Sequence, residues 1–307
     1  MKIWLDTWTL KEKYYKELFE KYPEHQFSTV MEDSYDADII ICMPGFVTKE
    51  NLDNFHKLKW IQLLTAGYNT IDLEYIKNRN ILLTYAKDVF SIQIAEDVFS
   101  KILYFNRNIG IYHDQIKSGL WKHTQVLHEI CHSTVGIIGA GSIGTEIAKR
   151  MKSFDAKVIG YRRSKGEHEF YDVMYRDRKG FEKLLKTSDY IIISIPLNKE
   201  TYHLIGVNEF KMMKSTAILI NVARGEIIDQ KALIEALENK KIRGAGLDVT
   251  TPEPLPENDL LWSTRNVFIT PHNSSASPYV HQRLMDEVSD TLDRYINHLE
   301  LDNIVKL

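Results

Sequence analysis

Short apolar runs alternate with amphipathic stretches along most of the 307-residue chain. Near-continuous apolar runs predict strands of parallel sheets that are covered by helices on both faces. The pattern occurs twice with a long helix between the copies, so we predict an α/β protein with two doubly wound, Rossmann-like domains. The predicted strands are residues 2–5, 38–43, 60–64 and 81–85 in the first copy and 134–138, 157–160, 190–195, 217–222, 245–249 and 267–270 in the second.

Two long helices set the predicted domain boundaries. The segment 92–109 carries apolar residues at helical spacing and connects the two copies of the strand pattern. A second long helix is predicted to start at Ser277-Pro278, because serine suits the N-cap and proline suits the first helical turn. This helix follows the last predicted strand and can carry the chain back to the first copy. We therefore predict a discontinuous domain of residues 1–91 and 278–307, and a second domain of residues 92–277.

The composition is that of a globular protein and argues against several classes of partner. Hydrophobic residues make up 44% of the chain and charged residues 26%. A formal net charge of -3 leaves no basic surplus for a nucleic-acid backbone. No apolar stretch approaches the length that spans a bilayer, and residues 1–6 end in a carboxylate, which favours a strand over a secretory signal. We expect a cytoplasmic protein without a metal centre, in which Cys42 and Cys131 are free thiols.

A glycine-rich loop at residues 139–144 follows one of the predicted strands. Its sequence is Gly-Ala-Gly-Ser-Ile-Gly, and a helical pattern begins directly after it. In that context Gly139 permits a tight turn, Gly141 lets the backbone approach a pyrophosphate, and Gly144 lets the helix pack closely on the sheet. The helix start would offer N–H groups and a partial positive charge to phosphates. The loop therefore predicts a dinucleotide site that includes Ser142 and Ile143.

Three charged residues lie at the ends of predicted strands in the second domain. Arg224 follows the strand 217–222, Glu253 lies beyond 245–249, and His272 follows 267–270. Ligands of open parallel sheets bind outside the carboxyl ends of the strands. Each residue alone has an ordinary structural explanation, as a surface ion pair, a solvated charge or a core histidine. Their shared position downstream of a dinucleotide loop favours one reaction centre.

The three side chains match what the reduction of a keto acid requires. An arginine offers a planar fork that binds the substrate carboxylate through two hydrogen bonds. A histidine titrates near neutrality and can protonate the oxygen that becomes negative as hydride arrives. A carboxylate beside the imidazole orients it and favours its charged form. We therefore predict that Arg224, Glu253 and His272 are catalytic.

At these residues the chain resembles the D-isomer-specific 2-hydroxyacid dehydrogenases, and the resemblance covers essentially its whole length. The matching stretches, in order along the chain, are residues 62–69, 94–96, 119–121, 139–144, 195–201, 221–225, 247–256 and 270–272. The resemblance implies that His272 is the acid/base, that Glu253 is its partner and that Arg224 binds the substrate carboxylate. It also implies a first domain that acts as the substrate or cap domain, a second domain that binds NAD(P), and a homodimer.

The resemblance further implies contacts for cofactor and substrate. The backbone around Ala66 and Gly67, next to Tyr68, would bind the substrate carboxylate together with Arg224 and His272. The cofactor contacts expected outside the glycine loop are Pro196, Thr201, Val222, Ala223 and Asp248. Tyr68, Tyr85 and Trp121 are aromatic candidates for the pocket, although ordinary packing explains them as well. The carboxy-terminal regulatory domain of some serine-pathway members is absent from residues 1–307.

The end of the second cofactor strand predicts a preference for NADP(H) over NAD(H). In an NAD site an acidic residue about 20 residues after the glycine loop binds the ribose 2′-hydroxyl. Here that place falls at Tyr161 or Arg162, followed by Arg163 and Ser164. Arg162, Arg163 and Ser164 offer cationic forks and a hydroxyl to a 2′-phosphate. The alternative is a solvated basic turn that binds nothing.

Three functional interpretations remain open on the sequence alone. The leading one is a 2-ketoacid reductase that forms a D-2-hydroxy acid, with glyoxylate or hydroxypyruvate as the best guess for the substrate. The alternative from another class is a nucleotide-sensing protein of the corepressor type, which would bind the cofactor without turnover. The intact trio of charged residues favours the enzyme. A formate-type dehydrogenase does not explain Glu253 beside His272.

Overall fold

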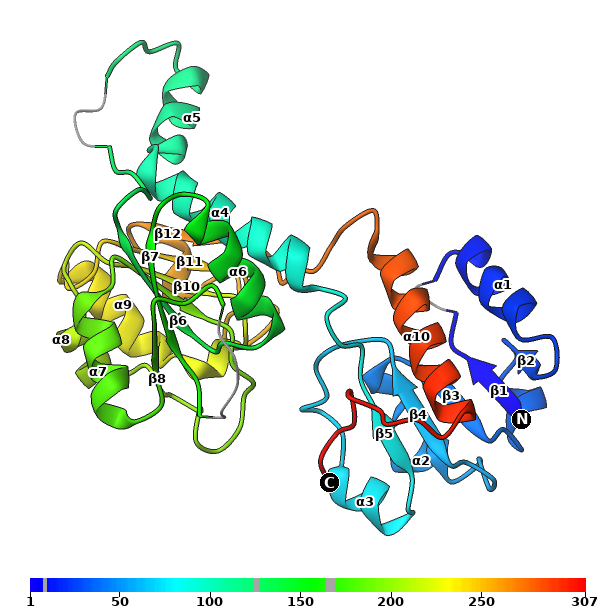
Figure 1. Cartoon of the computed structure of the whole chain (residues 1–307). Helices are drawn as coiled ribbons and strands as arrows, with labels where there is room; N and C mark the ends of the chain where they lie inside the picture. The colour runs from blue at the N-terminus through cyan, green and yellow to red at the C-terminus, as the bar shows by residue number, and fades with distance from the viewer. Residues whose placement is uncertain (8–9, 124–126, 164–168) are drawn as a thin grey trace. The chain divides into compact units, whose positions relative to one another are not determined.

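The structure is a computed structural model that describes residues 1–7, 10–123, 127–163 and 169–307. The chain forms two compact units (Figure 1). The first unit comprises Met1–Phe90 and Ser277–Leu307, and the second comprises Ser91–Ala276. Each unit is an α/β fold built on one parallel sheet, which confirms the predicted fold class.

The second unit is built on a seven-stranded sheet with the order β12-β11-β10-β9-β6-β7-β8. Every neighbouring pair in this sheet is parallel. The chain runs outward from β6 in one direction and from β9 in the other, so the strand order reverses between these two neighbours, where open α/β sheets bind ligands. The strands are β6 (Thr134–Ile138), β7 (Lys157–Tyr161), β8 (Val173–Tyr175), β9 (Tyr190–Ile193), β10 (Ile218–Asn221), β11 (Gly244–Leu247) and β12 (Val267–Ile269).

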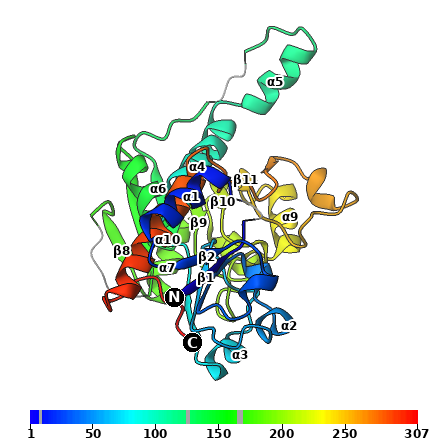
Figure 2. The same ribbon diagram turned by 90° about the vertical axis from the view of Figure 1, so that its right-hand side faces the viewer.

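Helices cover both faces of this sheet (Figures 1 and 2). On one face α4 and α6 pack together, and α4 also contacts β10 and β11. On the other face lie α7, α8 and α9, which contribute to a core cluster with the apolar strand residues. The helices are α4 (Ser91–Asn106), α5 (Ile109–Lys117), α6 (Ser142–Lys152), α7 (Arg178–Thr187), α8 (Val207–Met212) and α9 (Gln230–Glu238), with short 3-10 turns at Gly225–Ile227 and Leu260–Trp262.

The first unit is built on a five-stranded parallel sheet with the order β2-β1-β3-β4-β5. Alternate residues of each strand pack into two separate cores, one on each face of the sheet. Both sets are apolar, so the strands appear in the sequence as continuous apolar runs. Ile39 and Ile41 pack with α1 and α10, whereas Ile40 and Cys42 pack with α2 and α3. The elements are β1 (Lys2–Leu5), α1 (Glu12–Lys21), β2 (Gln26–Ser28), β3 (Ile39–Cys42), α2 (Lys49–Leu52), β4 (Trp60–Leu63), α3 (Leu73–Asn78), β5 (Leu82–Thr84) and α10 (Val280–Ile296), with 3-10 turns at Glu32–Ser34 and Pro44–Phe46.

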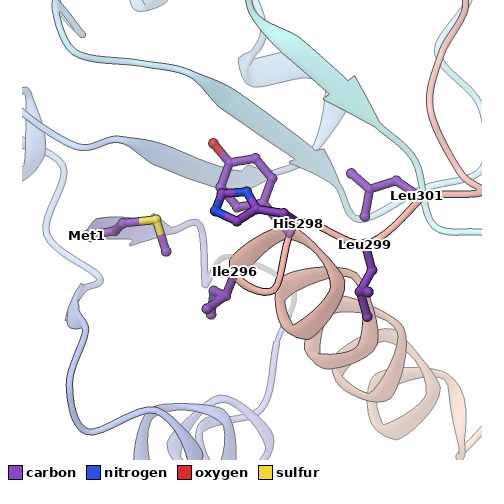
Figure 3. Close-up of a pocket in the computed structure, with 6 residues that line it drawn as sticks. Met1, Ile296, His298, Leu299 and Leu301 are labelled. Carbon is purple, nitrogen blue, oxygen red and sulfur yellow. The ribbon is translucent and has the colours of Figure 1, made fainter.

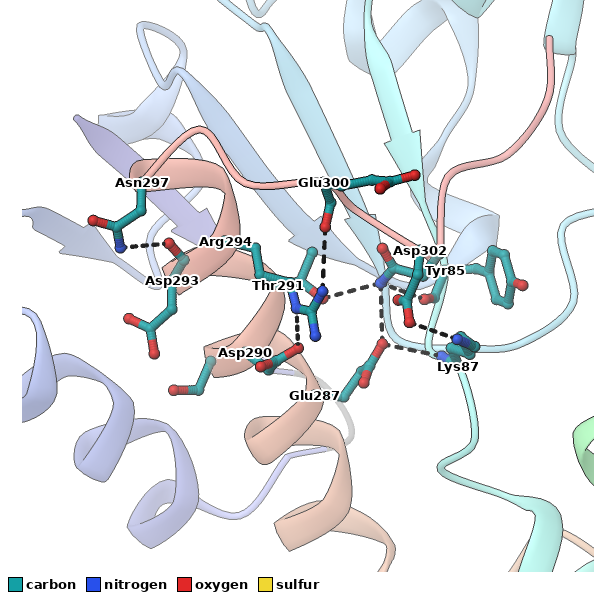
Figure 4. Close-up of polar contacts among 12 residues, drawn as sticks. Tyr85, Lys87, Glu287, Asp290, Thr291, Asp293, Arg294, Asn297, Glu300 and Asp302 are labelled. Atoms are coloured by element: carbon teal, nitrogen blue, oxygen red, sulfur yellow. Dashed lines mark hydrogen bonds and ion pairs between the residues drawn. The ribbon is translucent and has the colours of Figure 1, made fainter.

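The C-terminal segment is part of the first unit and is held to it by polar contacts (Figure 4). The side-chain amide of Asn303 donates to the carbonyl of Tyr85 at 3.1 Å and to the carboxylate of Glu287 at 3.0 Å. Lys87 pairs with Asp302 at 2.6 Å. The amide of Val305 donates to the carbonyl of Leu83 on β5 at 2.9 Å. The last residues therefore extend the fold formed by residues 1–90.

The structure adds two strands to the predicted elements and moves the bounds of two helices. Two strands were not predicted, β2 and β8, and each is a three-residue strand at the edge of its sheet. The helix predicted over 92–109 ends at Asn106, because Asn108 adopts a left-handed conformation (φ 53°) before α5 begins. The last helix begins at Val280 rather than at Pro278, and the Ser277 hydroxyl accepts a hydrogen bond from the Tyr279 amide instead of capping the helix.

Within the described ranges, none of the helices is long and apolar enough to cross a membrane. The same ranges contain no group of three or more His, Cys, Asp or Glu side chains that is arranged to hold a metal ion.

Candidate active site

The glycine loop joins β6 to α6 at the point where the strand order reverses. Gly139 has φ +110°, and a Cβ there would lie 2.5 Å from the carbonyl oxygen of Ser194, so only glycine fits. A Cβ on Gly144 would overlap the carbonyl oxygen of Gly139. A Cβ on Gly141 would meet no atom within 4 Å. The chain's own packing therefore does not require the middle glycine, and the open space beside it, at the first turn of α6, fits a pyrophosphate.

His272 and Glu253 form a directly bonded pair beyond the ends of β12 and β11. The Nδ1 atom of His272 lies 2.7 Å from Oε2 of Glu253. The other carboxylate oxygen of Glu253 accepts a hydrogen bond from the Thr250 amide at 3.0 Å. A carboxylate only accepts hydrogen bonds, so the proton in the pair lies on Nδ1 and Nε2 is left for another partner. Both side chains are partly open, with 46% and 37% of their surfaces exposed.

Arg224 lies on the turn after β10, and the loop that follows β11 approaches that turn closely. The Asn221 side chain shapes the turn, because it donates to the Arg224 carbonyl at 2.8 Å and accepts from the Ala223 amide at 3.0 Å. A Cβ on Gly225 would overlap the carbonyl of Thr250. Gly225 therefore lets the arginine turn lie against the loop that leads to Glu253. The half-buried Arg224 donates from Nη1 to the Ala223 carbonyl at 2.6 Å.

Asp248 is buried at the end of β11 and holds the segment that carries His272. Its Oδ1 accepts hydrogen bonds from the Thr270 hydroxyl at 2.6 Å and from the Asn273 amide at 3.1 Å. The Ser274 amide donates to both carboxylate oxygens. Burial raises the pKa of Asp248, but the hydrogen bonds from Ser274 and Thr270, together with the charge of Lys101, outweigh burial and hold the pKa below its usual range.

Sequence reasoning missed Lys101, Asp97 and Thr270, which adjoin this network. Lys101 is fully buried on α4, pairs with Asp97 and donates to the Thr270 hydroxyl at 2.9 Å. A signal was present in the sequence: Lys101 falls in the apolar stripe of α4 together with Val98 and Ile102, and Asp97 lies four residues before it. A charged residue in a buried stripe, with an opposite charge at helical spacing, indicates a buried ion pair.

The arginines after β7 have different surroundings. Arg162 is half-buried and donates from Nη1 to the carbonyl of Ala140 in the glycine loop at 3.0 Å. Arg163 is largely exposed and pairs with Glu200 in the segment after β9. Ser164 lies outside the described residues. The structure therefore brings the Arg162 guanidinium to the glycine loop and ties Arg163 to a carboxylate.

The remaining predicted cofactor residues lie on the loops after β9 and β10 and at the start of α6. Thr201 closes its own loop, since its hydroxyl donates to the Pro196 carbonyl at 2.8 Å and accepts from the Asn198 amide at 2.8 Å. Val222 and Ala223 are buried on the turn before Arg224. Ser142 is the first residue of α6, and its hydroxyl lies 2.6 Å from that of Ser91.

The predicted substrate residues Ala66, Gly67 and Tyr68 follow β4 in the first unit. The Thr65 hydroxyl donates to the Gly67 carbonyl at 2.9 Å, which fixes the backbone of this loop. The rings of Tyr68 and Tyr85 pack against each other with their centroids 5.8 Å apart. The third aromatic candidate, Trp121, lies beyond α5 with 92% of its surface exposed.

The first unit has a shallow hollow whose lining differs from the charged residues of the candidate active site (Figure 3). It lies at the end of α10, and its lining residues are Met1, Tyr295, Ile296, His298, Leu299 and Leu301. These six side chains include no carboxylate or guanidinium. The charged groups suited to catalysis lie instead at the strand ends of the second unit.

Comparisons with known proteins agree with the fold and identify the family. Residues 99–274 match the NAD-binding domain of the D-isomer specific 2-hydroxyacid dehydrogenases. The glyoxylate reductase of Thermococcus gammatolerans is 33% identical over 297 residues, which cover 94% of this chain and 88% of the relative. A D-isomer specific 2-hydroxyacid dehydrogenase family protein from Aeromonas salmonicida matches with a TM-score of 0.87 at 30% identity, over 99% of this chain and 98% of the other.

An acyclic imino acid reductase in complex with NADPH and D-Arg matches over the full length of both chains, with a TM-score of 0.85 and 27% identity. Other matching structures were solved with NAD. The matches cover both units, and the glyoxylate reductase exceeds 30% identity over nearly the whole chain. The chain therefore belongs to the D-isomer specific 2-hydroxyacid dehydrogenase family and is an NAD(P)-dependent oxidoreductase.

Proposed function

We propose that the protein reduces a small 2-keto acid of the glyoxylate or hydroxypyruvate type to the D-2-hydroxy acid. The observation that carries the proposal is the 2.7 Å contact between His272 and Glu253 at strand ends of the sheet that bears the glycine loop. Curated relatives named glyoxylate reductase support the choice of substrate class. A corepressor-type protein without turnover would not need an acid/base pair, so that alternative is not favoured.

Arg224, His272 and Glu253 each have a separate role in the proposed reaction. Arg224 binds the substrate carboxylate through its planar fork. His272 donates the proton on Nε2 to the keto oxygen, while Glu253 holds the proton on Nδ1 and stabilises the imidazolium. A reduced nicotinamide, when bound, would provide the hydride for the keto carbon. The keto carbon thus gains a hydride and its oxygen gains a proton, which balances the reduction.

The two units have separate roles in this proposal. Residues 92–277 bind the cofactor through Gly139, Gly141, Ser142, Ile143 and Gly144, assisted by the loops that follow β9 and β10. Residues 1–91 and 278–307 form the substrate domain. The fixed backbone of Ala66 and Gly67 supports a role for that loop in binding the substrate carboxylate, next to the ring of Tyr68.

We propose further that the cofactor is NADP(H) in preference to NAD(H). β7 ends at Tyr161 and is followed by two arginines, where an NAD site places a carboxylate. The contact of Arg162 with the Ala140 carbonyl supports a guanidinium held beside the glycine loop, where it would pair with a 2′-phosphate. Arg163 would also contact the 2′-phosphate once its ion pair with Glu200 is broken.

A homodimer is also proposed. Several large apolar side chains of α5 and the following residues are exposed, and a second copy of the chain could cover them. They are Ile109, Ile111, Ile116, Leu120 and Trp121. Light scattering at micromolar concentration tests the assembly, and a monomeric mass would contradict it.

The experiment for the function is a panel of 2-keto acids assayed with the purified protein and each reduced cofactor. We expect cofactor oxidation with glyoxylate or hydroxypyruvate, and higher kcat/KM with NADPH than with NADH. Absence of turnover with every acid would contradict the reductase. Equal or higher kcat/KM with NADH would contradict the cofactor preference alone.

A further inference from the structure

A chain of polar groups, in which Lys101 and Asp248 are buried and Asp97 and Thr270 are partly buried, runs from α4 to the segment that carries His272. The Lys101 ammonium is fully buried, pairs with Asp97 and lies 2.9 Å from the Thr270 hydroxyl. The Thr270 hydroxyl in turn lies 2.6 Å from Oδ1 of Asp248. The stem of Lys101 lies against Gly246 of β11, where a Cβ would come within 2.9 Å of the lysine Cβ. The strand thus has a glycine where the lysine side chain crosses it.

The direction of every hydrogen bond in this chain is fixed by chemistry. An ammonium group has only donors, so Lys101 donates and the Thr270 oxygen accepts. A hydroxyl has one hydrogen, and the Asp248 carboxylate has none to give, so the Thr270 hydrogen points to Asp248. Lys101 therefore orients the Thr270 hydroxyl as a donor toward Asp248.

Asp248 holds the turn around His272 from two sides. Its carboxylate accepts the amides of Asn273 and Ser274, and its backbone carbonyl accepts the His272 amide at 2.8 Å. His272 has φ +49°, a left-handed conformation that is strained for a residue with a side chain. Such a conformation persists only where the surroundings over-determine it. The hydrogen bonds to Asp248 supply that constraint.

The charges of this network are costly for stability alone. A buried ion pair commonly contributes no more than apolar side chains of similar volume would. Burial raises the pKa of Asp97 even though Lys101 lies beside it, so the ion pair does not offset the cost of burying that carboxylate. The network is therefore better explained by what it positions than by the stability that it adds.

We propose that Lys101 is a positioning residue, which acts through Thr270 and Asp248 to hold the His272 turn in its catalytic conformation. The proposal rests on the acid/base role of His272 in the proposed function. Lys101 is separated from His272 by two side chains, so it touches neither substrate nor cofactor in this role. No sequence motif of the site includes it.

The first test replaces Lys101 by methionine in the full-length protein. We expect kcat with the best keto acid to fall about ten- to a hundredfold, as small displacements of catalytic groups do, with a smaller change in KM. The charge of Lys101 helps to hold the pKa of Asp248 down, so the ionised acceptor is lost as pH falls. Without Lys101 the acid limb of the kcat/KM profile should move to higher pH. A purely structural role would not move this limb.

Two controls separate positioning from folding. Lys101→Met leaves Asp97 without its partner, so Asp97→Asn/Lys101→Met removes both charges together. Thr270→Ser keeps the hydroxyl, whereas Thr270→Val keeps the shape and removes it. We expect the double variant and Thr270→Val to resemble Lys101→Met, and Thr270→Ser to resemble the parent. In the cofactor-free protein, the imidazole NMR signal of His272 should move in Thr270→Val and not in Thr270→Ser.

The outcomes distinguish this inference from the proposed function. If His272→Ala remains active, the acid/base assignment itself is wrong. If His272→Ala is inactive but Asp97→Asn/Lys101→Met shows the parental kcat and pH profile, only the positioning role is overturned. Equal kcat, pH profile and His272 NMR signal in Thr270→Val and Thr270→Ser would also overturn the positioning role. This comparison remains possible even if the Lys101 variants fail to fold.

Discussion

Replacing Glu253 by glutamine changes the donor and acceptor balance beside His272. The two carboxylate oxygens face two donors, the Thr250 amide at 3.0 Å and the Nδ1 proton of His272 at 2.7 Å. A glutamine side chain offers one acceptor oxygen, and its amide group only donates. One of the two hydrogen bonds must therefore break, or the imidazole must move its proton to Nε2. Each outcome removes part of the hydrogen bonding that orients the imidazole.

The expected magnitude follows from the exposure of the pair. A hydrogen bond to a charged group contributes about 1.5–3 kcal/mol, and exposed ion pairs contribute about 0.2–1 kcal/mol. Because 46% of the His272 side chain and 37% of the Glu253 side chain are exposed, we take about 1 kcal/mol as the free energy of the interaction between the two side chains. That energy corresponds to a roughly fivefold loss of kcat/KM. Loss of the carboxylate removes the partner that orients the imidazole, so the reduction should become slower.

The assay measures kcat/KM for reduction in the parent and in Glu253→Gln. Glu257→Gln is the matched control, because it removes the same charge from an exposed position of the same loop. We expect the roughly fivefold loss in Glu253→Gln alone. Parental kcat/KM in Glu253→Gln, or an equal loss in Glu257→Gln, would refute this role of Glu253.

Further predictions concern substrate binding, cofactor preference and packing. Arg224→Gln should lower kcat/KM for the keto acid roughly 10–100-fold through a higher KM, and Arg224→Lys should recover part of it; unchanged KM in both would count against the carboxylate contact. Arg162→Asp should reduce kcat/KM with NADPH far more than with NADH, and equal losses would argue against a 2′-phosphate contact. Gly225→Ala should lower the free energy of unfolding by about 1–3 kcal/mol in a denaturant titration, because its Cβ overlaps the Thr250 carbonyl; parental stability would mean that this loop shifts freely.

The sequence predicts those strands whose residues are buried on both faces of a sheet, because burial produces a continuous apolar run. Strands such as β3 and β9 are covered on both faces, so they appear as continuous apolar runs. β2 and β8 are three-residue edge strands without a buried residue, and they were not predicted, whereas the equally short edge strands β5 and β12 were predicted from the apolar runs at 81–85 and 267–270. The end of α4 depends on the left-handed conformation of Asn108, which composition does not reveal.

The candidate site was partly predictable for a similar reason. Glycine spacing and strand-end charges are enough to identify the loop at 139–144 and the pair of His272 and Glu253 from the sequence. The buried support of the site was not predictable in the same way. Lys101 and Thr270 are 169 residues apart in sequence, and only the packing of α4 against the sheet brings them together.

The central claim is that His272 supplies the proton in an NAD(P)H-dependent reduction of a 2-keto acid. The most direct test measures kcat for oxidation of the preferred reduced cofactor, with saturating glyoxylate or hydroxypyruvate, in the parent and in His272→Ala. The account predicts turnover in the parent and a roughly 10²–10⁴-fold lower kcat in the variant, with nearly unchanged affinity for the cofactor. Near-parental turnover in His272→Ala would contradict it.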